Sequence, residues 1–223
     1  MEKKTLGDIA HSATKAILNS VPYVGGAATE IFTLLVASPI EKRRDIWMKE
    51  VGERLLLLET NNNLDLNQLQ QNELFIDVVL HTTQSALRTS SQLKRQCYQN
   101  ILLNSATVKS IDDTQIQIFI NLINSFTDWH IRIIELFNNP TEWFKRNSIV
   151  FPPMLQGSLT DVLTTAYPVL KDSKELCSLI WSDLHRSGLF NTPSIGGLMS
   201  GNGLMANRTT ILGQQFLEYI KSE

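Results

Sequence analysis

The stretch DSKELCSLIWSDLHRSGLFNTPSIGGLMSGNGLMANRTTILGQQFLEYIKSE, residues 172–223, decides how this chain is organised. Asp172 and Glu175 form a capping-box pattern that opens a helix, and Gly188 follows where a left-handed closing residue is usual. A glycine-rich tract with short β-compatible pieces comes next, and the residues from Leu212 onward predict a closing helix. The chain therefore ends in two helical patterns separated by a glycine-rich excursion.

Two further helices are expected just upstream, in TDWHIRIIELF (residues 127–137) and LTDVLTTAYPVL (residues 159–170). Together with the tract above, residues 127–223 resemble a winged-helix domain. In that resemblance SKELCSLIWSDLHRSGLF is the recognition helix, GGLMSGNGLMANRTTI is the wing, and TILGQQFL fits the T-x-L-G-x-x-F-L ending common after such wings. The resemblance implies a C-terminal domain with a small β-hairpin.

The residues before this domain predict a helical bundle. Ser38-Pro39-Ile40-Glu41 combines a serine cap, a first-turn proline and a glutamate, so a helix is expected from there to about Thr60. Residues 73–106 predict two helices broken near 88–91, and Ser110 is expected to cap another. The predicted fold is mainly α, with a helical bundle over 1–126 and a winged-helix-like domain over 127–223. VPYVGGA and SPIEKRRDIW resemble segments of uncharacterised bacterial proteins, and no characterised family is recognised.

Residues 16–40 carry a single charge, Glu30, over a length that could span a membrane. Pro22 and Gly25-Gly26 divide the stretch into short pieces, which argues against a constitutive span. Two interpretations stay open: a buried central helix of a soluble bundle, or a hairpin that inserts into a membrane when released. The candidate inserting residues are Tyr23, Gly25, Gly26, Ile31, Phe32, Leu34 and Leu35.

DNA binding is the activity that the winged-helix resemblance brings with it. Lys174, Arg186 and Arg208 are the candidate nucleic-acid contacts on the recognition helix and the wing. The polar residues expected on the outer face of that helix are nearly neutral in sum, and residues 127–223 hold eight Lys and Arg against nine Asp and Glu. Because duplex binding depends on neutralising phosphates, a protein-contact use of the domain is favoured over DNA binding.

No recognisable catalytic chemistry accompanies this architecture. The chain lacks G-x-S-x-G, H-E-x-x-H, P-loop, G-x-G-x-x-G and EF-hand motifs, its four histidines are isolated in sequence, and its net charge is −2. Cys97 and Cys177 have no ligand-type spacing, which predicts no metal site and a reducing, cytoplasmic location. No catalytic residue, cofactor or metal is predicted.

The leading hypothesis is a non-enzymatic protein-interaction or regulatory protein with a protein partner. The first alternative is a membrane-active effector of bacterial defence or cell-death type, such as an antiviral one, that uses the apolar hairpin. The second alternative is a winged-helix transcription regulator. The sequence leaves the partner, the oligomeric state and the biological process open.

Overall fold

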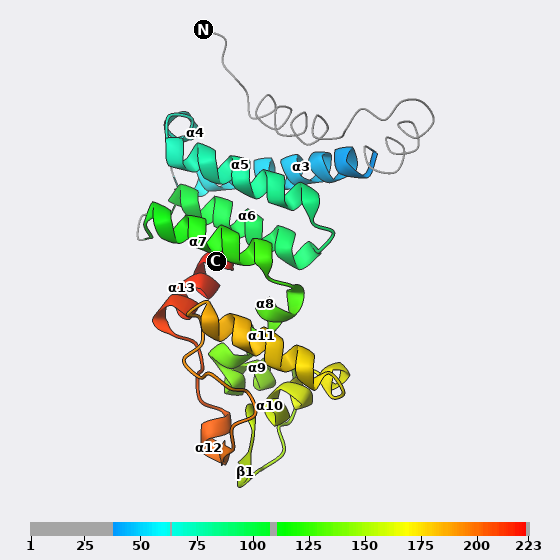
Figure 1. Ribbon diagram of the computed structural model, residues 1–223. Helices are drawn as coiled ribbons and strands as arrows, with labels where there is room; N and C mark the ends of the chain where they lie inside the picture. Colours follow the sequence, from blue (N-terminus) through cyan, green and yellow to red (C-terminus); the bar gives the residue numbers. More distant parts are fainter. Residues whose placement is uncertain (1–37, 63, 108–110, 222–223) are drawn as a thin grey trace, which may run out of the picture. The chain divides into compact units, whose positions relative to one another are not determined.

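The computed structural model describes residues 38–62, 64–107 and 111–221, and these form a mainly helical protein (Figure 1). The only sheet within those ranges is a small antiparallel pair of strands. The predicted mainly α class is therefore confirmed. The chain divides into two compact units that meet at Asn124 and Ser125, and the boundary proposed from the sequence falls after Phe126.

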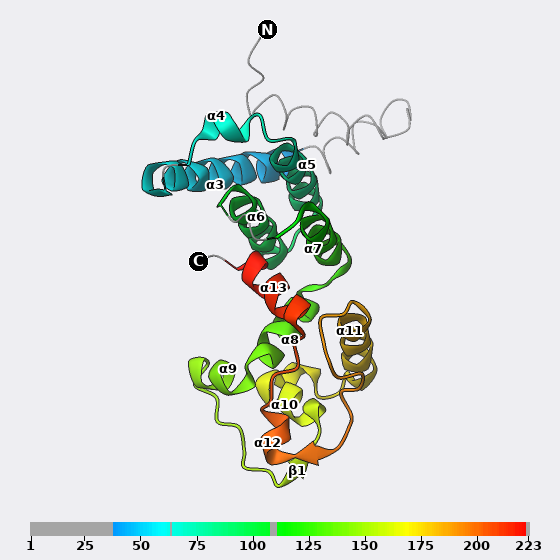
Figure 2. The same cartoon turned by 90° about the vertical axis from the view of Figure 1, so that its left-hand side faces the viewer.

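The first unit contains helices α3 (Ser38–Asn62), α4 (Leu66–Leu69), α5 (Glu73–Arg88), α6 (Gln92–Thr107) and α7 (Asp113–Ser125). Helices α5 and α6 pack closely on each other, and α3 packs on both (Figure 2). Trp47, Val51 and Leu55 form the buried stripe of α3, about one residue per turn. The indole Nε1 of Trp47 donates a hydrogen bond to Thr83 Oγ1 at 3.0 Å, which anchors α3 on α5.

The break predicted near residues 88–91 is confirmed, because α5 ends at Arg88 and α6 begins at Gln92. Thr89 is extended there, and Ser91 Oγ accepts a hydrogen bond from Lys94 N at 3.1 Å, which satisfies a free amide at the start of α6. The predicted cap Ser110 lies outside the described residues. Asp112 Oδ1 accepts from Gln115 N at 2.8 Å at the start of α7.

The second unit begins with α8 (Asp128–Asn138) and α9 (Pro140–Arg146), followed by β1 (Gln156–Gly157), α10 (Leu159–Ala166) and the 3₁₀ turn η2 (Pro168–Leu170). Its later elements are α11 (Lys174–Arg186), β2 (Met199–Ser200), α12 (Gly201–Leu204) and α13 (Ile211–Ile220). Helix α8 is central, because Ile133, Leu136 and Phe137 are fully buried and α9, α11 and α13 all contact it. The sequence predicts one helix from Leu159 to Leu170, but Pro168 interrupts it, so that α10 ends at Ala166 and η2 follows.

The sheet differs from the hairpin expected inside the glycine-rich tract. Strand β2 pairs with β1, which precedes α10, in the register Gln156 with Ser200 and Gly157 with Met199. The tract continues from β2 into the short helix α12, and an isolated antiparallel bridge between Phe190 and Thr209 closes the loop. Gly201 permits this close approach, because its amide bonds Leu155 O at 3.0 Å and a Cβ there would overlap the carbonyl of Met154.

Within the described ranges, no helix combines the length and the apolar composition that a bilayer crossing requires. The candidate inserting hairpin, from Tyr23 to Leu35, lies outside those ranges. The membrane-active alternative therefore stays a prediction.

Candidate functional site

Helix α11, the recognition-helix equivalent of the sequence analysis, is the element of the second unit that presents the most distinctive outer face. One side of the helix carries Cys177, Ile180, Trp181 and Leu184, all of which are buried. The Nε1 of Trp181 donates to Thr192 O at 2.8 Å, and its ring packs on Phe137 with the centroids 4.9 Å apart. These contacts fix which side of α11 faces away from the core.

Two leucines lie on the outer side of α11. Leu176 is 43% exposed and Leu179 is 55% exposed, and a spacing of three residues makes them neighbours on the helix surface. Val169, in the turn η2 just before α11, is 74% exposed. Only polar residues are expected on this face from the sequence, so the exposure of these apolar side chains differs from that expectation.

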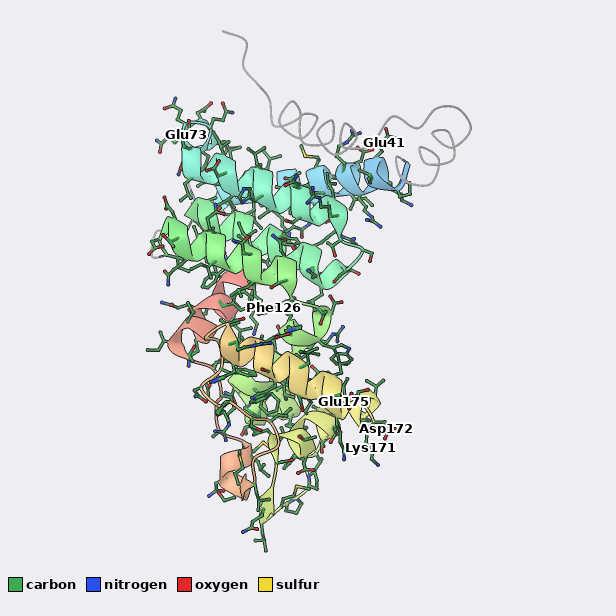
Figure 3. The ribbon with its side chains drawn as sticks, in the orientation of Figure 1. Glu41, Glu73, Phe126, Lys171, Asp172 and Glu175 are labelled. Carbon is green, nitrogen blue, oxygen red and sulfur yellow. The ribbon has the colours of Figure 1, made fainter. Side chains whose placement is uncertain are left out.

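The charged side chains around these leucines include both signs. Lys171, Asp172 and Glu175 project outward near the start of α11 (Figure 3). Lys174 is exposed beside Glu175. The outer face is thus apolar in part and close to electrically neutral.

Arg186, a predicted nucleic-acid contact, lies at the last position of α11 and forms an ion pair with Asp183, with 2.5 Å between Arg186 Nη2 and Asp183 Oδ1. Desolvation works to raise the pKa of Asp183, but the hydrogen bonds from Arg186 and from His130 outweigh it and lower that pKa below its usual value. The positive charge of Arg186 is therefore partly neutralised within its own helix.

Arg208, the predicted wing contact, turns toward its own loop. Its NH2 group donates hydrogen bonds to Gly203 O and to Met199 Sδ, and the residue is only partly exposed. Desolvation lowers the pKa of the guanidinium. In this position Arg208 holds the glycine-rich tract together.

The three predicted nucleic-acid contacts are not brought together into one patch. Lys174 and Arg186 are the first and last residues of α11, which places their Cα atoms about 18 Å apart along the helix axis. Arg208 follows α12 and is bonded to the tract between β2 and α13.

His130 is the buried polar residue that sequence reasoning missed. Its Nδ1 accepts a hydrogen bond from Thr127 N at 3.1 Å, and its Nε2 lies 3.4 Å from Asp183 Oδ2, so it joins the start of α8 to α11. Thr127 Oγ1 lies 3.0 Å from the same Nδ1. This resembles a hydroxyl, imidazole and carboxylate chain, but the first two groups form a capping box and the imidazole is only 5% exposed. The arrangement is that of a structural cap.

In the part of the chain that the structure describes, no three His, Cys, Asp or Glu residues lie close enough together to hold a metal ion. Cys97 and Cys177 are both buried, and neither is part of a disulfide. Burial raises the pKa of the Cys177 thiol, which keeps it protonated and unreactive at neutral pH.

No protein-family model, curated protein or solved structure matches the chain. The expectation that no characterised family would match is confirmed. What the second unit can bind must therefore be inferred from its own exposed side chains, and the outer face of α11 is the surface they mark most clearly.

Proposed function

We propose that this protein is a non-enzymatic protein-interaction or regulatory protein, and that residues 127–223 form a winged-helix-like domain whose partner is another protein. The order of α10, α11, the glycine-rich tract closed by the Phe190–Thr209 bridge and α13 supports the winged-helix comparison. Two buried cysteines outside any disulfide fit a reducing, cytoplasmic location. Fold alone carries no function, so the proposal rests on the surface of α11.

The observation that carries the proposal is the pair of exposed leucines on α11. Leu176 and Leu179 are both exposed, and under the winged-helix comparison they would take positions at which a DNA-binding helix presents polar and basic side chains. Burying such a pair against an apolar partner would remove two large side chains from water, with a gain of roughly 1.5–3 kcal/mol for each side chain fully buried. The mixed charges of Lys174 and Glu175 would then form part of the polar rim.

The basic residues support the same choice of partner. Arg186 is paired with Asp183, and Arg208 bonds the carbonyl of Gly203. A phosphate backbone would have to compete with these internal acceptors for both guanidinium groups. A partner with an apolar, nearly neutral surface meets no such competition.

The test uses the full-length tagged protein as bait in an extract of cells that make it. We expect at least one protein to be retained by the wild type and lost by the double variant Leu176→Ser/Leu179→Ser. Ile211→Ser is the matched control, because Ile211 is 77% exposed at the start of α13. Purified partner should then bind the double variant at least about tenfold more weakly than the wild type and the control.

Two results would contradict the proposal. One is equal retention of every captured protein by the wild type and the double variant, which would remove α11 as the binding surface. The other is turnover of a metabolite from the same extract by the purified wild type, which would make the protein an enzyme.

A further inference from the structure

A polar cavity of about 510 Å³ lies in the first unit, where residues of α5, α6 and α7 and the α5–α6 connection meet. Its volume is in the range of sites that hold small molecules. It is separate from α11 and from every residue that the sequence analysis singled out for binding.

The cavity is formed by regularly spaced positions on its three helices. His81 and Arg88 are seven residues apart on α5, Lys94 and Tyr98 are four apart on α6, and Asn121 and Asn124 are three apart on α7. Each spacing places its residues on one side of a helix. Three polar helix faces therefore converge on one space.

The charge of the lining has one sign. Arg88 and Lys94 are cationic, whereas none of the described residues that line the cavity is Asp or Glu. The chain as a whole has 22 acidic and 20 basic side chains, so its net charge is −2. The cavity is a positively charged space in a protein of slightly negative net charge.

Hydrogen bonds hold the inner wall of the cavity in place. Tyr98 donates its hydroxyl to Asn124 Oδ1 at 2.8 Å, and Lys94 Nζ donates to Asn124 O at 3.2 Å. Burial raises the pKa of Tyr98 to about 12, so its hydroxyl keeps its proton at neutral pH. Asn124 is thereby fixed between two α6 side chains, and the cavity wall is preorganised.

We infer that this cavity is a binding site for a small phosphate-bearing anion, contacted by Arg88, Lys94 and His81. Lysine and arginine bind phosphate oxygens through charge-assisted hydrogen bonds, and asparagine amides can donate to the same oxygens. The start of α6, which lies between Arg88 and Lys94 in sequence, adds the positive end of a helix dipole. The ligand class is thus set by charge and by donors, and the group attached to the phosphate is set by the remaining volume.

Isothermal titration calorimetry of the full chain at neutral pH and low salt tests this inference, with pyrophosphate and ADP as probes. We expect pyrophosphate to bind, with an affinity that falls as salt is added. Equal affinities for the two probes would mean that the phosphate group alone is recognised, and tighter binding of ADP would assign the rest of the cavity to a nucleoside.

Three variants and one control locate the binding. Arg88→Gln and Lys94→Gln should each weaken pyrophosphate binding about tenfold or more. Asn121→Asp, at an exposed position of the lining, should abolish it by placing a carboxylate in the cavity. Lys42→Gln removes an exposed charge from α3, away from the lining, and should leave the affinity unchanged.

Two outcomes would overturn the inference. The first is the absence of binding heat for both probes with the wild type. The second is an affinity that Arg88→Gln and Asn121→Asp change no more than Lys42→Gln does. Circular dichroism of each variant identifies any that fails to fold, and Arg88 and Asn121 are both exposed, so their substitution leaves the core intact.

Discussion

A single histidine joins three parts of the second unit. The ring of His130 stacks on Phe126 with the centroids 4.7 Å apart and an interplanar angle of 8°, and its Nδ1 caps the start of α8. Because Nδ1 accepts the Thr127 amide proton, the hydrogen-bond pattern assigns the ring proton to Nε2, which faces Asp183. Capping, stacking and the link to α11 all depend on this one side chain.

His130→Ala should therefore destabilise the protein by roughly 1–3 kcal/mol, since it removes a helix cap together with buried packing. Urea unfolding followed by circular dichroism measures the change. His81→Ala is the control, because His81 is exposed, and it should stay within about 0.5 kcal/mol of the wild type. An equal effect of the two substitutions would show that the His130 contacts contribute nothing.

Asp183 gives the second unit a pH dependence in the acid range. Its pKa is lower in the folded protein than in the unfolded chain, so its contribution to stability is fully present above the unfolded-state pKa of about 3.9. That contribution is lost as the pH falls through the lower folded-state pKa. The partners that favour the charged carboxylate are Arg186 and His130.

Asp183→Asn should consequently lower the urea midpoint at neutral pH, and the difference from the wild type should shrink as the pH falls below about 4. Denaturation curves of both proteins over an acid pH series provide the measurement. A difference that stays constant over the whole series would show that the carboxylate charge is not what stabilises the fold.

At the scale of elements, helix α13 shows how a close backbone contact specifies one residue. Gly213 is buried in its first turn, and its amide N–H donates a hydrogen bond to the capping Thr210 Oγ1 at 3.0 Å. A Cβ at this position would overlap the carbonyl oxygen of Leu189. Gly52, in the middle of α3, has no atom within 4 Å of where its Cβ would lie.

The two glycines should therefore respond in opposite directions to the same substitution. Gly213→Ala should destabilise by roughly 1–3 kcal/mol, because backbone atoms must move to make room. Gly52→Ala should stabilise by roughly 0.5–1 kcal/mol, because alanine loses less backbone entropy in a helix. Urea unfolding of the two variants checks the pair, and a shift of the same sign in both would refute the explanation.

The elements themselves were predictable where capping and periodicity act locally. The break between α5 and α6 and the left-handed Gly188, with φ of 74°, agree with their sequence signals. Helix α9 begins at Pro140, the helix position at which proline is favoured. The capping box expected at Asp172 is shifted, since Ser173 occupies the cap position of α11. The exposure of Leu176 and Leu179 was not predictable, because α11 has more apolar residues than one buried stripe can accommodate, and only its neighbours select among them.

At the scale of the whole molecule, charge bears on the DNA-binding alternative. The net charge is −2, and the basic residues proposed as DNA contacts are separated on α11 or bonded internally. Non-specific affinity for duplex DNA comes almost entirely from neutralised phosphates.

The full chain should therefore give no mobility shift of a short duplex at low salt. An electrophoretic assay over a protein titration provides the measurement. A salt-dependent shift that Arg186→Ala or Arg208→Ala weakens would instead support the transcription-regulator alternative.

The sequence by itself determined the helical class, most helix boundaries and the absence of recognisable catalytic motifs, because caps, prolines and 3.6-residue periodicity act within a few residues of one another. Tertiary structure alone decided the pairing of β1 with β2, the burial of His130 against α11, the exposed leucines of that helix and the cavity lined by Arg88, Lys94 and His81. Each of these joins residues far apart in the chain or depends on which side of a helix its neighbours cover. Such contacts leave no fixed spacing in the sequence, so only the packed chain reveals them.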